Sequence, residues 1–104
     1  MASVRGVHII AKGERGEARR IAVDIRQHNR FLIGTNSFFG AGVYAWYEEH
    51  LPENLRDAPQ VLFEIDDSRI DSVVSRAGVP SGFFRIPGRI GDYVPIRVIR
   101  FANL

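Results

Sequence analysis

The chain contains one segment that joins a two-glycine turn directly to a strand of apolar and aromatic residues: FFGAGVYAW, residues 38–46. Glycine tolerates backbone conformations and close approaches that other residues do not, and residues 43–46 have the composition of a strand. In an extended strand Tyr44 and Trp46 share one face, whereas Val43 and Ala45 share the other. The segment therefore predicts either a turn into an ordinary core strand or one wall of a small-molecule site.

Around this segment, short strands alternate with one helix. Apolar residues spaced i, i+3, i+4 and i+7 predict an amphipathic helix over residues 14–29, ending near Asn29. Apolar side chains on both faces of the final strand predict that it is central in its sheet. Together these elements predict an α+β fold with a small, mostly antiparallel split sheet and one main helix. Its strands are expected over residues 4–11, 43–46, 61–65, 83–86 and 93–101, with brief helical turns near residues 47–51.

Composition predicts a single cytoplasmic domain, residues 1–104. The hydrophobic fraction of 45% is enough to bury one core. The chain has no cysteine, and its three histidines lack the i, i+4 spacing of a helical metal site, so neither disulfides nor a metal are expected. No apolar run approaches the ~20 residues of a membrane span, and no signal-peptide pattern opens the chain. All fourteen basic residues except Lys12 are arginine, which suits a phosphate-bearing ligand.

The order of these elements and the glycine–tyrosine motif resemble the ADP-ribosyltransferase fold. The similarity is to the branch that includes the poly(ADP-ribose) polymerases and the small rifampin-modifying transferases. In that branch a Gly-x-Gly-(Ile/Val)-Tyr segment walls the nicotinamide pocket, and the tyrosine ring stacks on the nicotinamide. Gly40, Gly42, Val43 and Tyr44 match this motif, with Trp46 further along the same strand. The resemblance implies that these residues bind NAD as a substrate, without a metal.

The resemblance also assigns roles to a histidine and an arginine. His8 lies in the first strand, where the family has a histidine that holds the adenosine-side ribose of NAD. Ile9 follows it where the family has glycine, and the alternative is a strand histidine hydrogen-bonded in place. One of three arginines would clamp the pyrophosphate: Arg5, Arg85 or Arg89.

Three aspartates are candidates for the catalytic carboxylate. Asp92 precedes Tyr93 at the place where the polymerase-like pattern has a glutamate that stabilises an oxocarbenium-like transition state. The rifampin-modifying pattern places its aspartate earlier, after the strand at residues 61–65, and so nominates Asp67 or Asp71. Asp92 is the first choice of the three. Each of them is also an ordinary turn or cap residue in a purely structural interpretation.

The resulting hypothesis is a compact domain that transfers ADP-ribose from NAD to an unknown protein, nucleic-acid or small-molecule acceptor, or hydrolyses NAD. By analogy it would be a toxin of a bacterial or phage conflict system. The short chain allows a minimal enzyme, a lobe completed by a partner protein or by homo-oligomerisation, or a copy that binds without catalysing. The alternative function is a non-catalytic protein- or nucleotide-binding module with an exposed aromatic surface, formed by Tyr44, Trp46 and Tyr47 together with Phe38 and Phe39. A weaker alternative is single-stranded nucleic-acid binding.

Overall fold

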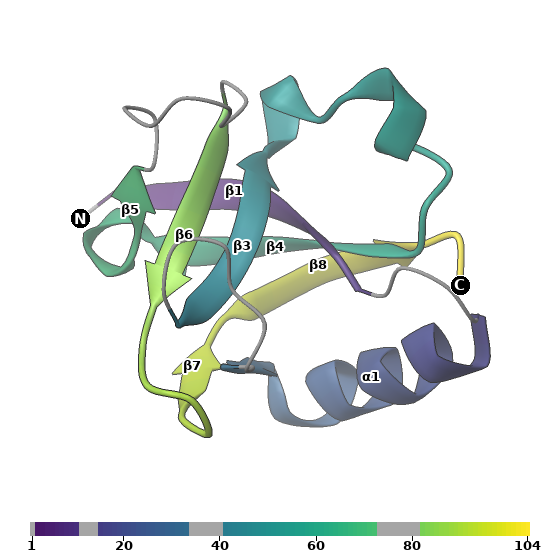
Figure 1. Ribbon diagram of the computed structural model, residues 1–104, viewed down its shortest axis with the longest axis horizontal. Helices are drawn as coiled ribbons and strands as arrows, with labels where there is room; N and C mark the ends of the chain where they lie inside the picture. Colours follow the sequence, from purple (N-terminus) through teal and green to yellow (C-terminus); the bar gives the residue numbers. More distant parts are fainter. Residues whose placement is uncertain (1, 11–14, 34–40, 73–81) are drawn as a thin grey trace.

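The computed structural model describes residues 2–10, 15–33, 41–72 and 82–104. Six strands form one antiparallel sheet in the order β5-β6-β3-β1-β4-β8, and β2 and β7 form a second, two-stranded sheet (Figure 1). The prediction of an α+β fold with antiparallel sheets and one helix is confirmed. The elements are β1 (Ser3–Ile9), α1 (Arg15–His28), β2 (Arg30–Leu32), β3 (Gly42–Tyr47), η1 (Glu48–His50), η2 (Glu53–Leu55), β4 (Gln60–Asp66), η3 (Asp67–Arg69), β5 (Asp71–Ser72), β6 (Phe83–Pro87), β7 (Tyr93–Pro95) and β8 (Arg97–Ala102).

The helix α1 covers residues 15–28 of the predicted 14–29, and residue 14 lies outside the described residues. Glu17 lies in its first turn, and Arg26 and His28 lie in its last turn, the placement that the helix dipole favours. Asn29 ends the helix with a φ of 48° and donates its backbone N–H to the carbonyl of Ile25 at 2.7 Å. Asparagine is one of the few residues that adopts this left-handed conformation readily. In the described part of the chain, no helix has the length and apolar character that a membrane crossing requires.

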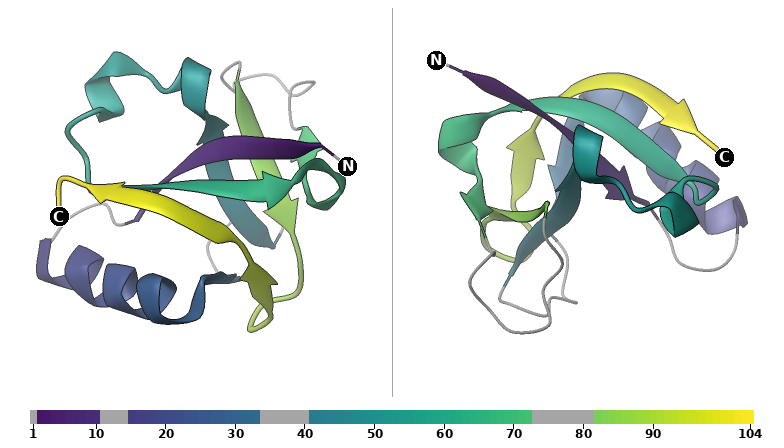
Figure 2. Two further views of the ribbon diagram at one scale, coloured as in Figure 1. Left: turned by 180° about the vertical axis from the view of Figure 1, so that it is seen from behind. Right: turned by 90° about the horizontal axis from the view of Figure 1, so that it is seen from above.

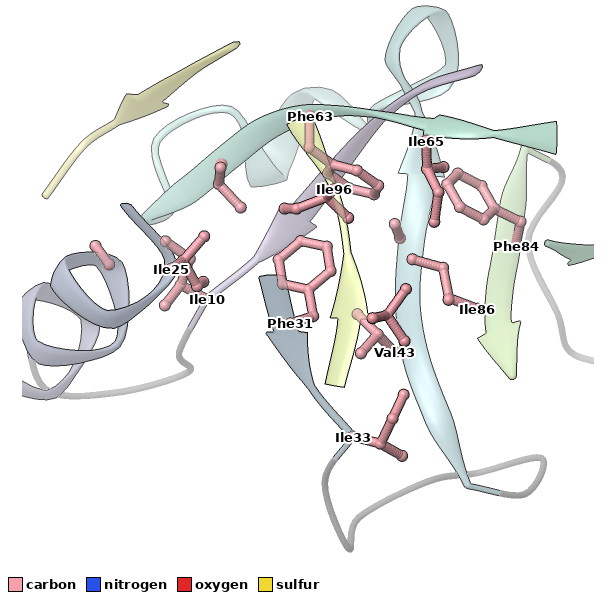
Figure 3. Close-up of a cluster of buried hydrophobic side chains, with 14 of the residues drawn as sticks. Ile10, Ile25, Phe31, Ile33, Val43, Phe63, Ile65, Phe84, Ile86 and Ile96 are labelled. Atoms are coloured by element: carbon pink, nitrogen blue, oxygen red, sulfur yellow. The ribbon is translucent and has the colours of Figure 1, made fainter. Parts of the chain in front are cut away.

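One hydrophobic core joins α1 and the small sheet to a single face of the six-stranded sheet. Phe31 of β2 is 2% exposed and meets Phe63 of β4 edge-on, with ring centroids 4.9 Å apart (Figure 3). Seen from behind, α1 runs along β8 (Figure 2), where Arg26 lies over the ring of Phe101. The largest fully buried side chains of this core are Phe63, Phe84, Ile33, Ile86 and Val61.

We call the side of the six-stranded sheet that packs on this core the core face, and the opposite side the outer face. Residues paired across neighbouring antiparallel strands point to the same face. Val43 pairs with Ile86, and Ala45 with Phe84, and all four are buried in the core. The intervening residues of β3 and β6 therefore point to the outer face.

The prediction of one central strand over residues 93–101 is wrong. Two strands occupy these residues, β7 in the small sheet and β8 at the edge of the large sheet. Ile96 lies between them, and its N–H donates to the carbonyl of Asn29 at 2.9 Å. The chain thus pairs with β2 through β7, bonds to the residue that ends α1 through Ile96, and then pairs with β4 through β8. Val98 and Phe101, which point to the core face of β8, are half-buried against the core, where α1 lies beside this edge strand.

Candidate functional site

Strand β3 places Tyr44 on the outer face of the six-stranded sheet. It lies between β1 and β6, and Tyr44 is half-buried. Its neighbours Val43 and Ala45 point the other way, into the core, with 5% and 1% of their surfaces exposed. Alternation along the strand therefore places Tyr44 and Val43, two residues of the predicted motif, on opposite faces of the sheet. Tyr44 can meet a ligand on the outer face, whereas Val43 supports the strand from the core.

Tyr44 belongs to a row of three polar side chains that crosses β3, β6 and β5. Arg85 pairs with Tyr44 in one neighbouring strand and with Asp71 in the other. The guanidinium Nη2 of Arg85 donates to Oδ2 of Asp71 at 2.9 Å. Hydrogen bonds to Asp71 and, more weakly, to the Tyr44 side chain raise the pKa of Arg85, while its partial burial acts in the opposite direction. We call these three residues the Tyr44–Arg85–Asp71 row.

Aromatic rings support the tyrosine end of the row. The ring of Phe83 lies nearly parallel to that of Tyr44, with an interplanar angle of 14° and centroids 5.7 Å apart. Trp46 meets Phe83 edge-on at 4.9 Å and is only 9% exposed. Trp46 therefore packs against Phe83, which in turn stacks on Tyr44, and Trp46 exposes little surface to a ligand. Tyr47 points to the core face, where its ring contacts Phe84 at 4.8 Å, so the aromatic surface expected from Tyr44, Trp46 and Tyr47 together does not form.

His8 lies on the core face, opposite to the side that carries Tyr44. Its imidazole packs against Phe31, with centroids 5.0 Å apart, and its cross-strand partner is the core residue Val61. The Nδ1 atom lies 2.7 Å from the backbone carbonyl oxygen of Tyr44, a distance at which an Nδ1–H donates to that oxygen. Burial lowers the pKa of His8, and the hydrogen bond to Tyr44 opposes this effect in part. The histidine and the tyrosine side chain do not converge on one site.

The three candidate aspartates lie in different places. Asp71 belongs to the row described above. Asp92 is exposed in the turn before β7, where its backbone carbonyl accepts from Ile33 and its N–H donates to Arg89. Asp67 begins η3 and is exposed. The first choice from the sequence, Asp92, has no described contact with Tyr44, whereas Asp71 is joined to it through Arg85.

The glycine part of the motif is described only in part, because Gly40 lies outside the described residues, as do Phe38 and Phe39. Gly42 does not have a positive φ angle. A Cβ atom at this position would lie 2.7 Å from the carbonyl oxygen of Ile86 and 2.9 Å from Cγ of Arg85. Close approach of β6 is therefore the reason that glycine is needed, and Gly42 helps to bring Arg85 against β3.

The other predicted phosphate ligands lie away from the row. Arg5 on β1 is 3.9 Å from a carboxylate oxygen of Glu48 and 3.8 Å from one of Glu64. Arg89 is exposed in the turn that leads to β7. Of the three arginines that the sequence nominates, Arg85 is the one that lies beside Tyr44.

A small cavity of about 110 Å³ opens on the outer face between η1 and strands β1, β4 and β8. Ligand-binding pockets usually measure about 300–1,000 Å³, so this cavity is too small for a dinucleotide. Tyr44, Arg85 and Asp71 do not line it. The row lies outside this cavity, and 53% of the Asp71 side chain and 23% of the Arg85 side chain are exposed. The cavity is lined by Val7, Glu48, Leu51, Gln60, Leu62, Arg100 and Ala102.

No protein-family model, curated protein or solved structure matches this chain. The resemblance to ADP-ribosyltransferases therefore rests on the motif and on the order of the elements. Within the described residues, no three histidine, cysteine, aspartate or glutamate side chains gather as metal ligands would. The Arg85–Asp71 pair and the role of Phe83 were not predicted. Part of this arrangement could have been predicted from the sequence, because alternation along residues 83–86 places Phe83 and Arg85 on one face of a strand.

Proposed function

We propose that this chain is a compact NAD-binding domain of the ADP-ribosyltransferase type and that the Tyr44–Arg85–Asp71 row is its substrate site. The observation that carries the proposal is the row itself. It sets an aromatic ring, a guanidinium and a carboxylate side by side on three neighbouring strands. By chemical type, these groups complement three parts of NAD: a stacked nicotinamide ring, the pyrophosphate, and the positive charge that develops on the ribose.

The chemistry requires little from the protein beyond position and charge. When the bond between the nicotinamide nitrogen and ribose C1′ breaks, the electron pair leaves with nicotinamide and positive charge develops on the ribose. The Asp71 carboxylate stabilises this charge. Tyr44 holds the departing ring in line by stacking on it. Water or an acceptor hydroxyl then bonds to C1′ and loses its proton to the solvent.

This proposal assigns roles that differ from those of the sequence-based hypothesis. Asp71 replaces Asp92 as the carboxylate, because it lies in the row and Asp92 lies in a turn beside the small sheet. His8 positions the backbone of Tyr44 through the carbonyl of that residue and does not contact the ribose. The rifampin-modifying pattern, with its earlier aspartate, is therefore the nearer analogy.

The test is NAD binding by calorimetry together with nicotinamide release, measured on the wild type and four variants. Tyr44→Ala should weaken NAD binding by about ten- to a hundred-fold, the usual effect of losing one stacked ring, and Tyr44→Phe should retain it. Asp71→Asn should slow nicotinamide release by about a hundred-fold or more, as loss of a charge-stabilising group does. The matched variant Asp92→Asn should leave release unchanged. Absence of NAD binding by the wild type, or a larger loss with Asp92→Asn than with Asp71→Asn, rejects the proposal.

A further inference from the structure

The carboxylate of Asp71 forms an ion pair with the guanidinium of Arg85. Its Oδ2 accepts from Nη2 of Arg85 at 2.9 Å, although 53% of the Asp71 side chain is exposed. Arg85 is more enclosed, with 23% of its side chain exposed, and it also interacts with the side chain of Tyr44. The guanidinium therefore occupies the middle of the row, between the Tyr44 ring and the Asp71 carboxylate.

In this position the Arg85 guanidinium can bind either the Asp71 carboxylate or the phosphate of a ligand. A carboxylate that already accepts a charge-assisted hydrogen bond has less capacity to stabilise a second positive charge. A phosphate group offers the guanidinium planar, bidentate bonding and more negative charge than one carboxylate. Arg5, elsewhere on the outer face, lies near two carboxylates, Glu48 and Glu64, and is the less available cation.

We propose that the Arg85–Asp71 ion pair is a latch that the pyrophosphate of a bound dinucleotide opens. The phosphate oxygens take the guanidinium, and the Asp71 carboxylate is released toward the ribose. The site thus becomes competent only when a phosphate-bearing ligand is present, and free nicotinamide riboside does not open it. This inference rests on the proposed function, because it concerns the same site.

The latch makes a prediction that can be tested without NAD, by titrating the protein with inorganic pyrophosphate. Asp71→Asn removes the competitor for Arg85 and should tighten pyrophosphate binding by about two- to five-fold, the range for an exposed ion pair. Asp67→Asn is the matched control, since it removes the same charge from a nearby exposed aspartate outside the row, and it should change binding much less. Arg85→Lys should weaken binding, because lysine cannot form the bidentate contact. Circular dichroism would verify that each variant is folded.

The outcomes separate the latch from the proposed function. Equal tightening by Asp71→Asn and Asp67→Asn overturns the latch, because the effect is then one of net charge. Unchanged binding with Arg85→Lys overturns it as well, and so does the absence of pyrophosphate binding in both the wild type and Asp71→Asn. If nicotinamide is released from NAD while the pyrophosphate titrations fail, the proposed function stands without the latch. If the titrations succeed and no nicotinamide is released, the anion site stands and the proposed function fails.

Discussion

His8 and Tyr44 are joined by a hydrogen bond, yet they belong to opposite faces of the same sheet. On the core face the imidazole contacts Phe31, in a region whose side chains are almost completely buried. On the outer face the phenol ring stacks on Phe83 beside the Arg85–Asp71 pair. The two faces differ in their packing here, because the core face is filled by buried apolar side chains, whereas Tyr44, Phe83 and Arg85 on the outer face are half-buried. Two residues that the resemblance assigns to one site can therefore be joined by a hydrogen bond and still lie on different faces of the sheet.

The largest contrast between the two faces should appear at two adjacent phenylalanines of β6. Phe84 points to the core and is fully buried, so Phe84→Ala should lower the free energy of unfolding by about 3–5 kcal/mol. Phe83 is half-buried on the outer face, and Phe83→Ala should cost clearly less. Urea denaturation of both variants measures the difference. Equal losses would mean that the outer face is packed as tightly as the core.

A smaller effect is expected at Gly42, where β6 lies close against β3. Gly42→Ala places a Cβ atom against the backbone of Ile86 and should lower the free energy of unfolding by about 1–3 kcal/mol. Gly16→Ala is the control, because a Cβ atom there meets nothing within 4 Å in α1, and it should stabilise by about 0.5–1 kcal/mol. Thermal or urea unfolding gives both values. An unchanged stability for Gly42→Ala would contradict the proposed reason for this glycine.

The smallest expected effect is the pH dependence that His8 confers on the core face. Its pKa in the folded protein is lowered from 6.5, so the unfolded chain takes up a proton first as the pH falls. Stability should therefore decline below about pH 6.5, by at most about 1.4 kcal/mol per pH unit, and level off below the folded pKa. Unfolding curves between pH 7.5 and 5 measure this slope.

Two variants test whether His8 causes this pH dependence of stability. His8→Gln should remove it, whereas His28→Gln, at an exposed position on α1, should preserve it. If His8→Gln does not fold, an NMR titration of the His8 imidazole in the wild type gives the same information. A folded pKa at or above 6.5 would show that the core face does not penalise the charged imidazole.

Much of the fold could be predicted from local patterns. The spacing of Ala18, Ala22 and Ile25 predicted α1, and alternation in the segment around Tyr44 predicted its two faces. The final strand was predicted wrongly, because its apolar residues on both sides indicate burial without showing what buries them. Ile96 bonds to the end of α1, and this contact between distant parts of the chain divides β7 from β8.

The candidate site was predicted less completely than the fold. Tyr44 was nominated from its own segment, and Asp71 was one of three candidate aspartates but not the first choice. The pairings of β3 with β6 and of β6 with β5 decide that Asp71 meets Arg85 beside Tyr44. No periodicity in the sequence encodes these pairings, since they join segments that are far apart along the chain.

The sequence by itself determined the helix, most of the strands and the side-chain alternation within each strand, because these depend on backbone geometry and on neighbouring residues. Tertiary structure alone decided which face each strand turned to the core. It therefore placed His8 on the core face of the sheet, Tyr44 on the outer face, and Asp71 next to Arg85. The physical reason is that burial of the apolar faces fixes strand order and register, and these bring together polar side chains from distant segments.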